Sequence, residues 1–285
     1  TRVQAVADTY GRTGQDVLVA IFDRGIDHNH LDFRDAEGNT RILAIYDLID
    51  DAGATDPDNP TGFGTVYTRA EINAALGSRF GHRDAVGHGT ATAGLVGGNG
   101  AASQGRYLGM APNVEFIIVK MTSEGAPAIG GEPAEAPFYR PDLLPVALDY
   151  VIGLAEAEGK PLVVDANIGS SGGPKDGTSA SARAIDARFG PADFWGATSG
   201  RREVLIDFNS ATTGTYTVRL TGTSVADGGF QASLNPSNII GAPPNRFASF
   251  ARPGYTVWDW ASAQSNLSLN SYVLRDTWTD ADGVE

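Results

Sequence analysis

The stretch "VLVAIFDRGID", residues 17–27, decides the fold. It opens with six apolar residues bounded by Asp16 and Asp23, a pattern typical of a strand buried on both faces of a parallel sheet. A glycine turn follows Asp23, and open α/β sheets form their sites beyond the carboxyl ends of the strands. The stretch therefore predicts a parallel α/β sheet, with Asp23 at the edge that carries the site.

Three further apolar runs have the same character and predict strands at 41–47, 114–120 and 161–166. Between the last two, apolar residues recur at helical spacing, which predicts a helix within 141–160 that ends at Gly159. Strands that alternate with helices favour a parallel sheet covered on both faces. We expect an α/β fold, a three-layer sandwich with a mainly parallel sheet.

The sequence pattern changes after about residue 200. Short alternating runs with Gly, Asp and Ser turns predict a small antiparallel β insertion at 201–245. We expect residues 1–200 to form the main domain and 246–285 to return to it and stop before it is complete. The Gly-, Pro- and Asp-rich stretches 49–64 and 124–137 are expected to be loops.

Composition excludes several classes of partner. The 285 residues carry 21 basic and 34 acidic side chains, a net charge of −13, which argues against nucleic acid or an anionic membrane surface. Without cysteine there is no disulfide framework or thiolate chemistry. No apolar run approaches about 18 residues, so we expect no membrane span, and residues 1–16 do not resemble a signal peptide.

A second stretch, "GHGTATAGLVGG" at 87–98, places His88 between two glycines before a run of small residues. We expect His88 at the start of a helix, with Gly87 and Gly89 leaving room for neighbours on both sides of the ring. A strand-end carboxylate is well placed to orient such an imidazole. The two stretches together predict that Asp23 and His88 lie within hydrogen-bond reach.

These stretches, in this order, resemble the two conserved motifs of the subtilisin-like serine peptidases, the subtilases. The segments "HLDF" at 30–33, "YLGMAPNVEFIIVKM" at 107–121 and "NIGSSGGPKDGTSA" at 167–180 are also similar to family segments. The resemblance implies a serine-type endopeptidase that hydrolyses peptide bonds, with Asp23 and His88 as catalytic residues. It also implies a polypeptide substrate.

Further expectations come from the same resemblance. Gly169 and Ser170 are implied to line the substrate cleft, and Asp32 is implied to bind calcium, as a structural ion that the chemistry does not require. The resemblance to the subtilases is also the sole basis for expecting an extracellular or periplasmic location.

The nucleophile departs from the family pattern. The Gly-Thr-Ser sequence of this chain, which ends at Ser179, lacks the proline of the family's serine motif and fits better as the end of the cleft segment. The family's oxyanion asparagine is not found, because Asn167 matches the earlier cleft strand instead. Either a missing C-terminal segment supplies the serine, or the chain is an inactive pseudopeptidase that acts as a protein-binding or scaffold module.

A metal hydrolase is a third interpretation, from a different class. His28 and His30 stand two residues apart, and His82 or Asp84 would have to complete the ligand set. Bound zinc or inhibition by chelators would indicate it. The subtilase resemblance accounts for more of the chain, because it explains Asp23 and His88 together.

Overall fold

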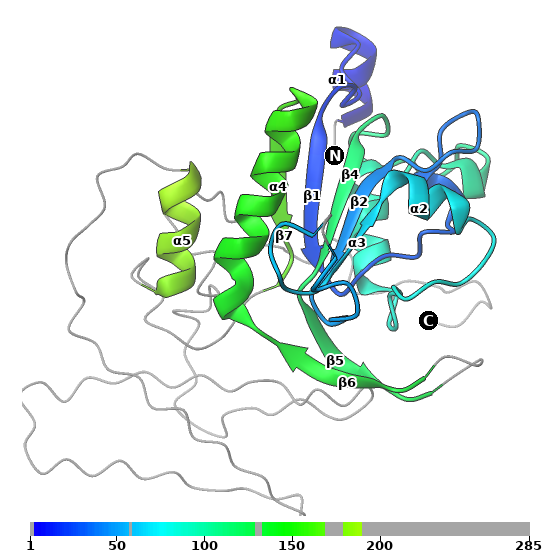
Figure 1. The fold of residues 1–285 in the computed structure, drawn as a ribbon. Coiled ribbons are helices and arrows are strands. Elements are labelled where there is room, and N and C mark those ends of the chain that lie inside the picture. The colour runs from blue at the N-terminus through cyan, green and yellow to red at the C-terminus, as the bar shows by residue number, and fades with distance from the viewer. Residues whose placement is uncertain (1–2, 57–58, 129–132, 169–178, 190–285) are drawn as a thin grey trace, which may run out of the picture. The chain divides into compact units, whose positions relative to one another are not determined.

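The computed structural model describes residues 3–56, 59–128, 133–168 and 179–189. A five-stranded sheet in the order β3-β2-β4-β1-β7 forms its centre (Figure 1). Its strands are β1 (Leu18–Asp23), β2 (Ile42–Asp47), β3 (Thr65–Thr68), β4 (Glu115–Lys120) and β7 (Leu162–Ala166). Only the β2–β3 pair is antiparallel. The mainly parallel sheet is therefore confirmed, and the four predicted strands are its four parallel members.

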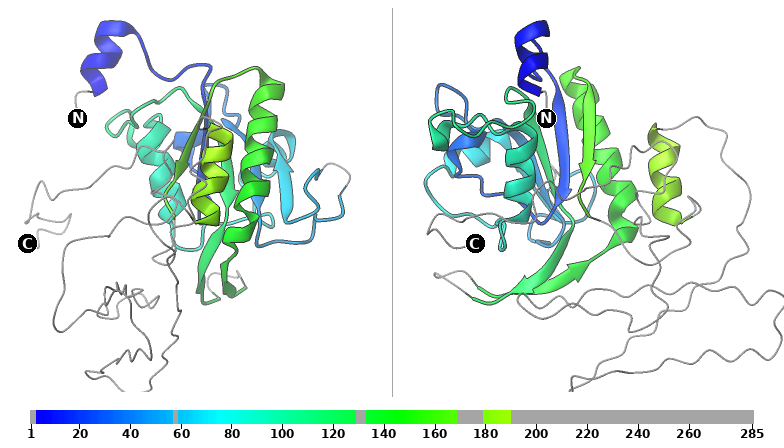
Figure 2. Two further views of the ribbon diagram at one scale, coloured as in Figure 1. Left: turned by 90° about the vertical axis from the view of Figure 1, so that its left-hand side faces the viewer. Right: turned by 180° about the vertical axis from the view of Figure 1, so that it is seen from behind.

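Helices cover both faces of this sheet, which confirms the three layers. Helices α2 (Arg69–Ala74) and α3 (His88–Gly97) lie on one side and α4 (Leu144–Glu158) on the other, as two opposed views show (Figures 1 and 2). Helix α1 (Val3–Tyr10) precedes β1, and short 3₁₀ turns lie at Leu31–Phe33, Ala101–Ser103 and Pro141–Leu143.

The core follows from the alternation of strand side chains. Val19 and Ile21 of β1 belong to one buried cluster with Ile72 of α2 and Ala93 of α3. All six residues of β1 are buried, so its remaining side chains point to the opposite face. That face is covered by the apolar side of α4, whose buried residues are Leu144, Ala147, Leu148, Val151 and Ala155.

The end of α4 has the predicted form. Gly159 adopts φ 65° and donates its N–H to the carbonyls of Ala155 and Glu156, which is the left-handed cap that glycine makes without strain. The helix begins at Leu144, later than predicted, because the Pro141–Leu143 turn precedes it.

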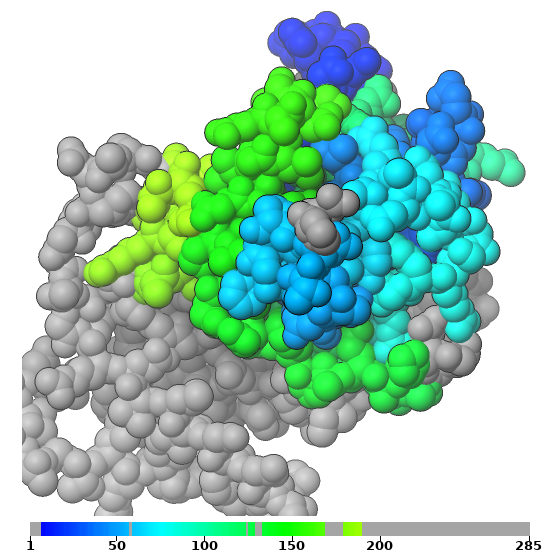
Figure 3. Space-filling view, in the orientation of Figure 1, coloured from blue at the N-terminus to red at the C-terminus, as the bar shows by residue number. Residues whose placement is uncertain are grey.

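The strand register brings three charged residues to one edge. Asp23 of β1 and Asp47 of β2 both pair in register with Lys120 of β4, so the carboxyl ends of three neighbouring strands meet there. The described residues of the segment that follows β2, 48–56 and 59–64, lie at the surface between α4 and α2 (Figure 3).

The expected loop at 124–137 is wrong in part. Strands β5 (Thr122–Ala126) and β6 (Glu135–Tyr139) pair as an antiparallel hairpin. Glycine and proline lower strand propensity, yet residues 122–126 and 135–139 pair in register, with Thr122 opposite Tyr139 and Ser123 opposite Phe138. Only the tip of the predicted loop lies between the strands.

Residues after 169 contribute one described element, α5 (Ala180–Phe189), which belongs to a second compact unit. The predicted insertion at 201–245 and the return at 246–285 lie outside the described residues, so both stay predictions. Of the helices that the structure describes, none is both long and apolar enough to cross a membrane.

Candidate active site

The carboxylate of Asp23 is fully buried at the end of β1. Its Oδ1 accepts hydrogen bonds from the backbone N–H of Arg24 at 2.7 Å and from Nδ1 of His88 at 2.7 Å. Its Oδ2 accepts from the hydroxyl of Thr92 at 3.0 Å. A buried carboxylate is tolerated only when such donors replace water, so these contacts fix Asp23 in one orientation.

His88 is the first residue of α3, and its side chain is 41% exposed. With Nδ1 on the Asp23 carboxylate, the tautomer assigned from this bond carries its proton on Nδ1. The part of the chain that the structure describes offers Nε2 no hydrogen-bond partner. Asp23 and His88 thus lie within hydrogen-bond reach as the sequence predicted, with the second ring nitrogen open to a substrate or a nucleophile.

Glycines allow this close approach. A Cβ on Gly89 would lie 2.0 Å from the carbonyl oxygen of Gly25, so the first turn of α3 packs directly on the turn that follows Asp23. Gly87 precedes the helix with φ 77°, a conformation that favours glycine. The small residues of the second motif therefore bring the imidazole onto the carboxylate.

Thr92 is a site residue that sequence reasoning missed. It lies four residues after His88, on the same face of α3, so the helical spacing could have indicated it. Its hydroxyl contacts Asp23 Oδ2 and the His88 carbonyl, and it accepts a hydrogen bond from Nδ2 of Asn167 at 3.0 Å. Thr92 thus joins the strand end, the helix start and the segment after β7.

A second carboxylate lies close to Asp23. Asp165 of β7 pairs in register with Ile21, and burial together with the negative charge of Asp23 raises the pKa of Asp165. Two carboxylates that share a partly buried edge resist being charged together. Asp165 therefore favours its protonated form more than an exposed aspartate does.

The other predicted site residues fall elsewhere. Oδ1 of Asp32 accepts from the backbone N–H of Ala102 at 2.7 Å, and no group of three or more potential metal-ligating His, Cys, Asp or Glu residues occurs among the described residues. Gly169 and Ser170 lie outside the described part of the chain. The hydroxyl of Ser179 accepts from the N–H of Ala182 at 3.0 Å and so caps α5.

The histidines of the metal interpretation have ordinary structural partners. His28 is buried, with Nε2 3.4 Å from the carbonyl of Ala75 and its ring against Phe80. Nδ1 of His30 accepts from the N–H of Asp32 and caps a 3₁₀ turn. His82 makes a buried pair with Asp47, described below.

Comparisons with known proteins find a matching family model and several similar solved structures. Residues 14–133 match the model of the subtilase family, Peptidase S8. The CspB protease of Clostridium perfringens is similar over 66% of this chain at 30% identity, with a TM-score of 0.53. The S41 psychrophilic protease (21% identity, TM-score 0.39) and Sphericase (19%, 0.42) are similar over the same share.

The chain spans only part of these proteins: 36% of the CspB protease and 48% of each of the other two. The matched residues contain both motifs, with Asp23 and His88, and they include β1 to β4 of the sheet. The fold is the subtilisin-like α/β fold, and residues 14–133, which carry both motifs, are similar to the subtilase family.

Proposed function

We propose that this chain supplies the acid–base residues of a serine endopeptidase that acts on polypeptides. The observation that carries the proposal is the 2.7 Å hydrogen bond between buried Asp23 and Nδ1 of His88. It leaves Nε2 as the proton acceptor of a side chain that is 41% exposed. The subtilase segment and the 30% identity to a protease support the same function.

In this mechanism a serine hydroxyl attacks the carbonyl carbon of a peptide bond. His88 Nε2 takes the hydroxyl proton as the new C–O bond forms, and it returns that proton to the leaving amine when the C–N bond breaks. Asp23 holds the Nδ1–H tautomer and stabilises the imidazolium between the two steps. Water then hydrolyses the acyl-enzyme by the same proton transfers.

The proposal does not assign Ser179 as the nucleophile. Its hydroxyl caps α5, and its sequence context matches the substrate cleft rather than the family's serine motif. Gly169 and Ser170 are proposed to contact the substrate, and Asp32 is proposed as a ligand of a structural calcium ion. An extracellular or periplasmic location is proposed on family grounds.

A fluorophosphonate probe tests the proposal, because it labels only an activated serine. We expect the product of the complete reading frame to hydrolyse peptides and to be labelled, His88→Ala to abolish both, and Ser179→Ala to leave both intact. Mass spectrometry of the labelled peptide then identifies the nucleophile. A protein that neither hydrolyses peptides nor takes the label is instead a silent binding module, and loss of label in Ser179→Ala would make Ser179 the nucleophile.

A further inference from the structure

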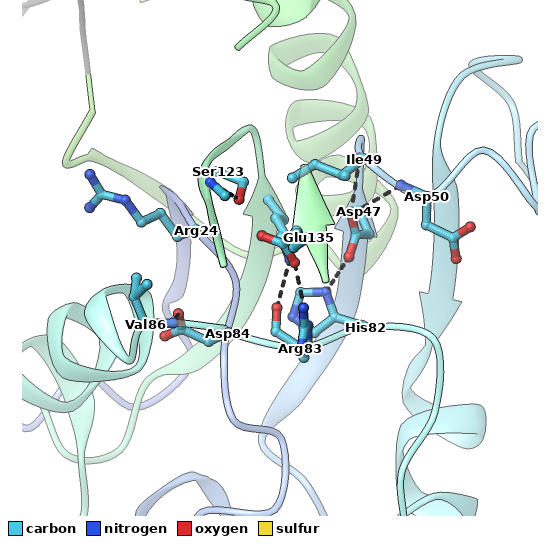
Figure 4. Close-up of polar contacts among 12 residues, drawn as sticks. Arg24, Asp47, Ile49, Asp50, His82, Arg83, Asp84, Val86, Ser123 and Glu135 are labelled. Atoms are coloured by element: carbon cyan, nitrogen blue, oxygen red, sulfur yellow. Dashed lines mark hydrogen bonds and ion pairs between the residues drawn. The ribbon is translucent and has the colours of Figure 1, made fainter. Parts of the chain in front are cut away.

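A second buried histidine–carboxylate pair lies at the same edge of the sheet. Nδ1 of His82 is 2.6 Å from Oδ2 of Asp47, at the end of β2, and each residue is only 2% exposed. Oδ1 of Asp47 accepts from the N–H of Ile49 and of Asp50, so both carboxylate oxygens are occupied (Figure 4). Both members of this pair are buried, whereas in the Asp23–His88 pair the histidine side chain is 41% exposed.

The opposite side of the His82 ring holds the turn that carries Asp23. Nε2 of His82 accepts the backbone N–H of Ile26 at 3.1 Å, and Ile26 is itself fully buried. A ring nitrogen that accepts a hydrogen bond carries no proton, so the ring is neutral with its proton on Nδ1, facing Asp47. Nε2 of His82 therefore holds the backbone N–H three residues after Asp23, while Nδ1 fixes the ring on Asp47.

The turn has little room to move from this position. Gly25 has φ 116°, and a Cβ there would lie 2.6 Å from the carbonyl oxygen of Arg83 and 3.0 Å from Cε1 of His82. On its other side, the carbonyl of Gly25 packs against Gly89 of α3. The turn after Asp23 is thus enclosed between residues 82–83 and the first turn of the helix that begins with His88.

Residues 82–83 are in turn attached to two strands. His82 is bound to Asp47 of β2, and the carbonyl of Arg83 accepts from Nζ of Lys120, at the end of β4, at 2.8 Å. Lys120 is 1% exposed, and its charge is balanced by Glu135 of the β5–β6 hairpin at 2.6 Å (Figure 4 labels Glu135 and Arg83). The sheet therefore sets the position of this segment, which leads directly into His88.

We propose that His82, oriented by Asp47, is a positioning residue that holds Asp23 and His88 in hydrogen-bonding geometry. It touches neither a substrate nor the reacting atoms. Its consequence for catalysis rests on the proposed function, whereas its effect on the geometry of the Asp23–His88 pair does not. The test therefore reads the geometry and the activity separately.

The geometry is read from the ring nitrogens of the four histidines by long-range ¹H–¹⁵N correlation spectra of the full chain. In the wild type we expect His82 protonated on Nδ1 alone, and neutral His88 in its Nδ1–H form. His82→Gln keeps a donor for Asp47 and an acceptor for Ile26, so His88 should keep its preference for that form. His82→Phe fills the space without either bond, so His88 should lose this preference.

His28→Phe is the matched control, because His28 is also a buried histidine but its ring nitrogen faces Ala75. We expect this variant to leave the His88 tautomer unchanged. A wild-type His82 protonated on Nε2 would overturn the proposal without any variant, even if His82→Phe failed to fold. So would a folded His82→Phe protein in which His88 kept its Nδ1–H form.

The activity arm uses the same variants, made in the protein that the fluorophosphonate test uses, with a peptide substrate. His82→Phe should lower kcat about 10²-fold, the scale expected for a small misplacement of catalytic groups, with KM changed less than about 3-fold. His82→Gln should restore kcat to within about 5-fold of the wild type. If the wild type hydrolyses no peptide, the proposed function fails, and the spectra still decide whether His82 positions the pair.

Discussion

At the scale of single residues, the site depends on how a buried charge is satisfied. Asp23 has no access to water, so the donors on Arg24, His88 and Thr92 must take the place of its hydration. This requirement links function to folding, because the bond that orients the imidazole also stabilises the carboxylate. We therefore expect loss of the Asp23 charge to change the orientation of the His88 imidazole in a protein that still folds.

Asp23→Asn tests this link. The amide keeps the size of the side chain, but its NH₂ group cannot accept the Nδ1 proton and its oxygen carries no full charge for the imidazolium. By analogy with the serine-protease triad, we expect kcat to fall about 10⁴-fold, measured with a peptide substrate at saturation. Asp35→Asn, an exposed carboxylate that caps Asn39, should change kcat by less than about 2-fold. A loss of under about tenfold in Asp23→Asn would contradict the assigned role.

At the scale of elements, the packing of α3 on the turn after β1 determines the site. The two elements approach so closely that a methyl group at Gly89 would meet the carbonyl of Gly25. His88 lies at the helix start, directly beside this contact. The helix cannot move outward without drawing the imidazole away from Asp23.

Gly89→Ala is therefore expected to reduce both stability and activity. Overpacking of this kind costs about 1–3 kcal/mol, and the shift should lower kcat about 10²-fold. Gly94→Ala is a matched control on the same helix, since a Cβ there meets nothing within 4 Å, and it should raise stability by about 0.5–1 kcal/mol. Urea unfolding and peptide hydrolysis measure the two effects, and equal behaviour of the two variants would refute the packing argument.

Sequence patterns predicted some of the helices and strands and missed others, for physical reasons. Apolar runs identified the four parallel strands, because a strand such as β1 that is buried on both faces is almost entirely apolar. Strand β7 was found by the same pattern although it is only partly buried. The β5–β6 hairpin was not predicted, since its glycines and prolines are typical of loops. Helix α2 and strand β3 were missed because a six-residue helix and a four-residue strand carry too little periodicity.

Sequence analysis predicted only those site residues that stand in a recognisable local motif. Asp23 and His88 each stand in a recognisable stretch, so their contact could be expected. The roles of His82 and Asp47 depend on two residues 35 positions apart, one in a loop and one at a strand end, that meet only in the folded chain. Such a pair has no local signature, and a single sequence gives no means to detect it.

At the scale of the whole molecule, paired buried charges make stability depend on pH. Burial alone would raise the pKa of Asp47, but the hydrogen bond and electrostatic attraction from His82, followed by the positive charge of Lys120, outweigh it and lower the pKa below its usual value. A lowered folded-state pKa means that the carboxylate stabilises the fold above its unfolded pKa, about 3.9. That contribution is lost as the pH falls through the folded-state pKa.

We therefore expect the free energy of unfolding of the wild type to exceed that of Asp47→Asn most at pH 5–7, above the unfolded pKa of about 3.9. The difference should shrink steadily as the pH falls below about 4, because protonation of Asp47 removes the charge that the variant already lacks. Urea unfolding at a series of pH values measures it. A difference that stays constant down to about pH 2 would show that the pKa of Asp47 is not lowered in the fold.

The central claim is that Asp23 and His88 act as one acid–base unit, and a double-mutant cycle on kcat tests it most directly. Asp23→Asn, His88→Gln and the double variant are compared with the wild type on one peptide substrate. If the pair acts as a unit, the double variant should be no slower than His88→Gln by more than about 3-fold, because Asp23 works only through the imidazole. Losses that multiply in the double variant would show two independent residues and would contradict the account.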